Sequence, residues 1–174
     1  MKKTITLLIF TVASLFAEID TQQPLSTITL EGDNGGYYSG KSWDSSVLNG
    51  KTTLLMYVDP DEKGKGEVFK PTIEAFEKDL DFDKFQILVI LNLDATWKPD
   101  FLIRKLMKSK LTDYPKRTYI LDTGSVLVEK WGLTNNEYNT VIINNERKVI
   151  YSHSGEWKDG EISKVNTLVR SEVK

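Results

Sequence analysis

Two stretches of the chain are apolar at nearly every position, from Thr52 to Val58 and from Phe85 to Leu91. Uninterrupted apolar runs of this length are typical of strands that are buried on both faces of a sheet. Each run is followed by polar residues and then by apolar residues three or four positions apart, which predicts an amphipathic helix. The first stripe comprises Phe69, Ile73, Phe76 and Leu80, and the second comprises Leu102, Ile103, Leu106 and Met107. The pattern in the middle of the chain is therefore strand, helix, strand, helix.

Shorter patterns complete the expected order of elements. Residues Ser26 to Leu30 alternate between polar and apolar, as a half-buried strand does, and the glycines that follow predict a turn. Tyr37 and Tyr38 are expected to begin the return strand of an N-terminal hairpin. Between residues 117 and 151 the pattern predicts a further strand and a second hairpin, and a last apolar stripe predicts a C-terminal helix. This order predicts an α/β fold, a three-layer sandwich in which helices flank a mixed central sheet.

The first seventeen residues have the pattern of an export signal. Lys2 and Lys3 precede an apolar stretch from Ile5 to Val12, and small residues follow as far as Ala17. The apolar stretch is shorter than the ~20 residues that a membrane-spanning helix needs. The pattern leaves the cleavage site open. We expect a cleaved signal at residues 1–17, a lead-in segment at 18–25, and one domain without a membrane span at 26–174.

Composition excludes several classes of function. The chain has no cysteine, so it forms no disulfide and offers no thiolate for redox chemistry. Its net charge is −2 at pH 7, and removal of Lys2 and Lys3 with the signal makes it more acidic. This charge argues against nucleic acid as a partner, because phosphate backbones require clustered Lys and Arg. The single histidine, His153, excludes a metal site built on two histidines. We expect no cofactor.

Several segments resemble a known fold family. Leu48 to Leu55 resembles the segment that leads into the central sheet of peroxiredoxins and periplasmic thiol–disulfide oxidoreductases. Residues 114–133 and 139–149 resemble the inserted strand and helix and the terminal hairpin of that branch, which implies a thioredoxin-like fold. More closely, Tyr38 to Lys51, with Asp113-Tyr114-Pro115 and Trp131-Gly132-Leu133, is similar to the YtfJ family of small exported bacterial proteins without an established function. The resemblance spans residues 26–172 and implies a periplasmic location.

Two departures from the pattern of thioredoxin-like enzymes remove their chemistry. The paired catalytic cysteines would fall between Asp61 and Gly66, where this chain has only Asp, Glu, Lys and Gly. The cis-proline of these enzymes would fall at about Tyr138. We expect a trans bond there, because a cis bond before a residue other than proline costs ~3 kcal/mol. A thiol–disulfide oxidoreductase or a peroxiredoxin is therefore excluded.

The loop after the first buried strand is the best candidate site, because open α/β sheets bind ligands at the carboxyl ends of their strands. The candidate binding residues in this loop are Asp59, Asp61, Glu62, Lys63 and Lys65. The candidate neighbouring wall consists of Tyr57, Asp94, Trp97 and Tyr138. The acidic spacing resembles a calcium loop, but lysines occupy its fifth and twelfth positions, so we assign no metal ligand. A solvated loop of charged residues is the simpler alternative.

Three functions are consistent with these patterns. The first is an exported, redox-inactive binding or adaptor module whose loop contacts an unknown periplasmic protein or small ligand. The second is a periplasmic enzyme that uses carboxylates or a metal at residues 59–67. The third, a DNA-binding regulator, is opposed by export and by the negative charge. We prefer the first hypothesis and assign no catalytic residue, since no pair of residues has a spacing typical of catalysis.

Overall fold

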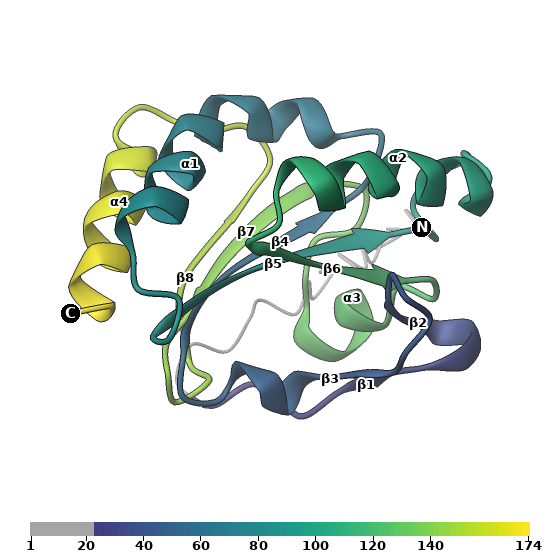
Figure 1. Cartoon of the computed structure of the whole chain (residues 1–174), viewed down its shortest axis with the longest axis horizontal. Helices are drawn as coiled ribbons and strands as arrows, with labels where there is room; N and C mark the ends of the chain where they lie inside the picture. The colour runs from purple at the N-terminus through teal and green to yellow at the C-terminus, as the bar shows by residue number, and fades with distance from the viewer. Residues whose placement is uncertain (1–22) are drawn as a thin grey trace, which may run out of the picture.

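Six strands form one mixed sheet in the computed structural model, which describes residues 23–174 (Figure 1). The strand order is β2-β6-β5-β4-β7-β8. At its centre, β4 (Thr52–Val58), β5 (Phe85–Asn92) and β6 (Arg117–Asp122) run parallel to one another. At its sides, β2 (Gly35–Tyr37), β7 (Tyr138–Ile143) and β8 (Val149–Ser154) pair antiparallel. The expected mixed sheet is confirmed, whereas the expected signal at 1–17 lies outside the described residues.

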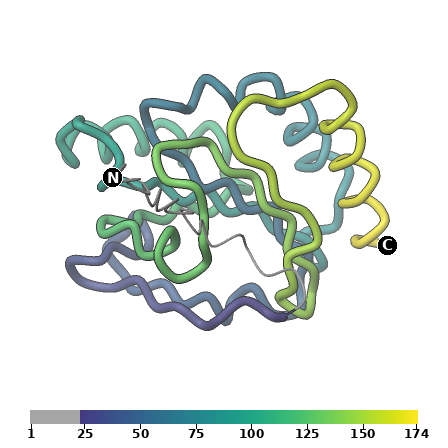
Figure 2. Tube along the Cα trace, turned by 180° about the vertical axis from the view of Figure 1, so that it is seen from behind, coloured from purple at the N-terminus to yellow at the C-terminus, as the bar shows by residue number. Residues whose placement is uncertain are grey.

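Helices cover both faces of this sheet. On one face lie α1 (Lys70–Asp79), α2 (Asp100–Asp113) and α4 (Glu161–Glu172). On the other face lie α3 (Val126–Trp131) and a small two-stranded sheet of β1 (Thr29–Leu30) and β3 (Trp43–Asp44). Figure 2 shows the same three layers from behind. The expected sandwich of helices around a mixed sheet is therefore confirmed.

The middle strand β4 serves two cores, because its side chains alternate between the faces of the sheet. Leu54, Met56 and Val58 pack toward α1 and α4, whereas Leu55 and Tyr57 pack toward α3. Every residue of β4 is buried, as expected of a central strand with helices on both sides. The loop that follows β4 therefore begins at the edge of the sheet, between the two layers that cover its faces.

The N-terminal hairpin has a different return strand from the one expected. Leu30 pairs with Trp43, whereas the segment around Tyr37 crosses to the main sheet and pairs with β6. Our prediction that Tyr37 and Tyr38 form the return strand was therefore wrong. The reason lies in Gly35, which has φ 111° and whose Cβ, if present, would lie 2.0 Å from the carbonyl oxygen of a β6 residue. Only glycine permits this close pairing, and a hydrophobic pattern does not reveal it.

Two further features differ from the expectations: where the domain begins, and how much of α2 is buried. Leu25, in the expected lead-in segment, is buried and donates its N–H to the Arg147 carbonyl, so the fold begins before residue 26. On α2, only two of the four residues in the predicted apolar stripe are buried. Ile103 and Met107 are buried, while Leu102 is 39% and Leu106 is 54% exposed. The outer half of this stripe is therefore free to line a surface.

Candidate functional site

The loops that follow β4 and β5 meet at the carboxyl edge of the sheet. Asp61, from the first loop, accepts a hydrogen bond of 2.7 Å from the Thr96 hydroxyl of the second loop. The same carboxylate forms an ion pair with Lys98. Parallel neighbouring strands bring their following loops together, which is why these residues meet. The two loops therefore form one continuous rim.

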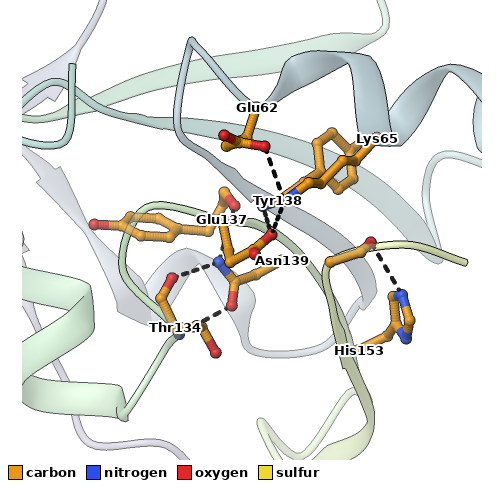
Figure 3. Close-up of polar contacts among 9 residues, drawn as sticks. Glu62, Lys65, Thr134, Glu137, Tyr138, Asn139 and His153 are labelled. Atoms are coloured by element: carbon orange, nitrogen blue, oxygen red, sulfur yellow. Dashed lines mark hydrogen bonds and ion pairs between the residues drawn. The ribbon is translucent and has the colours of Figure 1, made fainter. Parts of the chain in front are cut away.

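The loop after β4 is held in place rather than free in solvent. It continues into a 3₁₀ helix, η3 (Lys63–Phe69), that leads directly into α1. The Lys65 ammonium lies 2.8 Å from Glu62 and 2.8 Å from Glu137, at the start of β7, as Figure 3 shows. Lys65 donates hydrogen bonds to these two carboxylates, and both bonds raise its pKa, the one to Glu137 more strongly. Lys65 therefore ties η3 to the main sheet.

Asp59 is the buried member of the predicted set, with 4% of its surface exposed. Its carboxylate accepts a hydrogen bond of 2.8 Å from the backbone N–H of Asp61. Burial raises the pKa of Asp59, and the nearby Glu62 carboxylate raises it further, because both disfavour the charged form. The simpler expectation of a solvated loop therefore fails for Asp59.

Tyr138 packs against η3, in the segment where the resemblance to thioredoxin-like enzymes places their cysteines. The peptide bonds of residues 23–174 are all trans, which confirms the expectation for Tyr138. The Tyr138 ring packs so closely on Gly66 that a Cβ at residue 66 would lie 2.3 Å from the ring. Tyr138 is only 6% exposed, and burial raises the pKa of its hydroxyl. An aromatic ring thus fills the space beside η3.

The structure divides the predicted wall between the two faces of the sheet. Tyr57 lies on the α3 face and Tyr138 on the α1 face. Asp94 is engaged away from the loop, where its carboxylate accepts a hydrogen bond of 3.0 Å from Ser125. Trp97 is 83% exposed, with the Lys98 ammonium 5.6 Å from its ring centre. Of the four wall residues, Tyr138 packs on η3, and Trp97 lies on the rim beside Lys98.

A buried polar cluster on the α3 face was not predicted. Asp122 accepts hydrogen bonds from the Tyr57 hydroxyl at 3.1 Å and from the backbone N–H groups of Val126 and Leu127 at 2.9 Å. These contacts place a carboxylate at the start of α3, where the free N–H groups of a helix favour negative charge. In the sequence, Asp122 belongs to an Asp-Thr-Gly turn, which concealed this role. This cluster has a structural role, because it fixes the start of α3 to the end of β6.

The remaining polar groups give no metal site. Within residues 23–174, no three His, Cys, Asp or Glu side chains gather closely enough to hold a metal ion. His153 stacks on Trp157 at 4.5 Å, and its ring nitrogens face the Glu161 carboxylate and the Gly155 carbonyl. His153 is therefore part of the packing beside α4. No helix in the same part of the chain is long and apolar enough to cross a membrane.

A cavity of about 270 Å³ lies between η3 and α1 on one side and α2 on the other. Its floor is apolar and comes from the same face of β4, β5 and β6. The apolar and aromatic residues around it include Met56, Val58, Ile73, Val89, Leu91, Ile103, Leu106, Met107, Tyr119 and Tyr138. The charged residues around it are Lys63, Glu67, Lys70, Lys98, Lys110 and Arg117. Of the predicted site residues, Lys63 and Tyr138 line this cavity.

Sequence reasoning missed most of this cavity because its lining comes from segments far apart in the chain. One feature of the sequence did indicate part of this cavity. The α2 stripe carries four apolar residues, more than the two that the core uses, so Leu102 and Leu106 were left without a buried partner. Leu106 indeed lines the cavity, whereas Leu102 does not.

Comparisons with known proteins agree with this fold. The profile of a family described as "Bacterial protein of unknown function (YtfJ_HI0045)" matches residues 22–172. The uncharacterized protein YtfJ of Escherichia coli (strain K12) is 26% identical over 139 residues, which is 79% of this chain and 75% of that protein. A Chlorobium tepidum protein described as a thiol:disulfide interchange protein DsbE aligns with a TM-score of 0.66 and 16% identity, over 90% of this chain and 100% of its own. The exposed lipoprotein thioredoxin Etrx1 of Streptococcus pneumoniae strain TIGR4 aligns with a TM-score of 0.60 and 17% identity, over 82% of this chain and 99% of its own. These similarities confirm the expected thioredoxin-like fold.

Proposed function

Because this chain belongs to the YtfJ family of bacterial proteins and has no cysteine, we propose that it is an exported, redox-inactive module that binds a small molecule in the cavity beside Tyr138. The observation that carries this proposal is the cavity itself, with its apolar floor and few charged groups. Ligand pockets in proteins have this character, and their volumes begin near ~300 Å³. A small ligand is favoured over a protein partner because the apolar surface is concave.

The groups around the former redox position support the proposal. Tyr138 and Gly66 both line the cavity, so the packing that fills the position of the missing thiols also forms one of its walls. Lys65 holds this wall to β7 through Glu137. A wall fixed in this way keeps the cavity shaped before a ligand arrives, which reduces the entropy lost on binding. The site is a binding site built on the former catalytic position.

The enzyme hypothesis has less support. Its carboxylates, Asp59, Asp61 and Asp94, do not converge on one point, because Asp61 is paired with Lys98 and Asp94 with Ser125. Neither does any observation favour a DNA-binding regulator. The binding module is therefore the function we carry forward.

Export is part of the proposal and has its own test. The signal pattern of residues 1–17 supports a periplasmic location. Cell fractionation followed by intact-mass measurement should find the chain in the periplasm, shortened by its signal. A full-length chain in the cytoplasm would overturn the proposed location.

The binding role is tested by what the protein carries when it is purified from its own periplasm. Organic extraction and mass spectrometry should detect a bound compound in the wild type. The variant Leu106→Trp fills the cavity from a residue that is 54% exposed, so we expect the fold to be retained and the compound to be lost. The matched control is Leu102→Trp, one turn away on the same helix and outside the cavity lining, which should keep the compound. Equal amounts of compound in both variants would overturn the cavity as the binding site.

A further inference from the structure

The apolar floor of the cavity restricts the chemistry of its ligand. Met56 and Val89 on the floor, and Ile103 and Met107 on the α2 side, offer no strong hydrogen-bonding group to a bound molecule, and the uncharged polar groups of the lining are mainly tyrosine hydroxyls. A sugar or a nucleoside placed against these apolar residues would leave most of its polar groups unpaired, which weakens binding. The two methionines are flexible and adapt to a flexible apolar chain. The floor therefore fits a hydrocarbon chain.

The volume limits the length of that chain. The cavity of about 270 Å³ lies just below the ~300 Å³ at which ligand pockets begin, so it suits a small ligand. A single hydrocarbon chain of medium length fits such a space better than a long or doubled lipid tail. The ligand is thus a medium-chain compound.

The charges around the cavity are mostly positive, although the protein as a whole is acidic. Three of the five lining cations already have carboxylate partners, since Lys98 pairs with Asp61, Arg117 with Glu77 and Lys70, at 4.0 Å, with Glu74. Glu67 is the one lining carboxylate among the described residues. Lys63 and Lys110 have no carboxylate partner within residues 23–174, and the ion pair of Lys70 is long and exposed to solvent, so these three cations are available to an acidic group.

Two of these lysines gather around one aromatic ring. Lys110 lies 5.3 Å and Lys70 lies 5.9 Å from the centre of the Tyr114 ring, and the Arg117 guanidinium lies 3.9 Å from the same centre. Contact with Tyr114 raises the pKa of Lys70, so its ammonium stays charged at neutral pH. Tyr114 thus collects positive charge at one end of the apolar floor.

We propose that the cavity binds a medium-chain amphipathic acid, with its hydrocarbon chain on the sheet and its carboxylate or phosphate head at Lys70 and Lys110 beside Tyr114. This inference rests on the proposed function and names the class of its ligand. The head group and the chain contribute separately. The chain supplies affinity by burial, and the lysines select an anion over a neutral or cationic head.

Calorimetric titration with ten-carbon probes below their micelle concentrations tests this inference. Decanoate and decyl phosphate should bind, and decanol and decyltrimethylammonium should bind at least tenfold more weakly. The variant Lys110→Gln should weaken decanoate by about three- to fivefold, as expected for one partly exposed ion pair, and leave decanol unchanged. The matched control is Lys105→Gln, which removes an exposed charge from the same helix outside the cavity and should change nothing.

Each contrary outcome has a distinct meaning. If decanol binds as well as decanoate, the acidic head is wrong and the cavity remains a binding site. If Lys105→Gln weakens decanoate as much as Lys110→Gln does, only general charge attraction is present and the head-group site is overturned. If no probe binds while the periplasmic compound is still lost in Leu106→Trp, the ligand class is overturned and the proposed function stands. If no probe binds and no compound is found, both fail.

Discussion

The variant Gly66→Ala tests whether Tyr138 closes the former redox position by direct packing. A Cβ at residue 66 would lie 2.3 Å from Tyr138 Cε2 and 2.6 Å from its hydroxyl oxygen, well inside normal contact distance. Tyr138 is only 6% exposed and lines the cavity, so the ring can yield only by a shift within the packed layer or into the cavity. Something in the packing between η3 and β7 must therefore shift when the methyl group is added.

The size of the effect follows from two opposing contributions. Overpacking a well-filled site costs about 1–3 kcal/mol, while the same change of glycine to alanine in a helical turn stabilises by about 0.5–1 kcal/mol. We expect Gly66→Ala to lower the free energy of unfolding by about 0.5–2 kcal/mol. Gly64→Ala is the matched control, because a Cβ there meets nothing within 4 Å in the same 3₁₀ helix. It should raise stability by about 0.4–1 kcal/mol.

Urea unfolding followed by tryptophan fluorescence measures these changes, since the chain has four tryptophans. The decisive comparison repeats Gly66→Ala in a Tyr138→Leu background, where the ring atoms that cause the clash are gone. There the alanine should become neutral or stabilising, which gives a coupling free energy between residues 66 and 138 of about 1–3 kcal/mol. Equal effects of Gly66→Ala in both backgrounds would refute the packing argument.

Three further predictions concern the charged groups around the site. Because the folded state raises the pKa of Asp59, it binds a proton more tightly than the unfolded state, and stability falls as the pH rises through this raised pKa. Asp59→Asn should therefore be more stable than the wild type at pH 7 by urea unfolding, with the difference vanishing near pH ~4, and a pH-independent difference would contradict this cause. Lys65→Met removes the ion pair with Glu137 that links η3 to β7 and the local one with Glu62, so amide hydrogen exchange should rise in residues 62–66 and not in α4, and unchanged protection would show that the ion pairs do not hold the loop. Asp122→Asn turns an acceptor of α3 N–H groups into a partial donor and should lower the free energy of unfolding by about 2 kcal/mol or more, whereas a value near zero would remove Asp122 from the fixing of α3.

The central part of the fold was predictable because strands that are buried on both faces are continuous apolar runs in the sequence. The strands β4 and β5 are long apolar runs, and the helices after them repeat apolar residues at helical spacing. The edge strand β2 was not predictable in this way, because two of its three residues are glycines that pair with β6 through their backbone alone. A strand that pairs because its residues lack side chains shows no hydrophobic pattern in its sequence.

The candidate site was only partly predictable, for a different reason. Position in the chain identified the loop after β4, and the structure places Lys63 of that loop and Tyr138 in the cavity. Position could not tell which face each side chain takes, so Tyr57 and Tyr138 were grouped although they lie on opposite faces. The cations at Tyr114 come from three elements that meet only in the folded state.

The contact between Tyr138 and Gly66 makes thiol chemistry difficult to introduce beside η3 by mutation. A cysteine at residue 66 would place its Cβ against the tyrosine ring, so the first step toward an active pair would weaken the fold before it could yield any activity. Shrinking Tyr138 first would instead open a void beside η3 with no benefit to redox chemistry. Thiol chemistry at this position would therefore require changes at both residues together, and these positions lie far apart in the sequence.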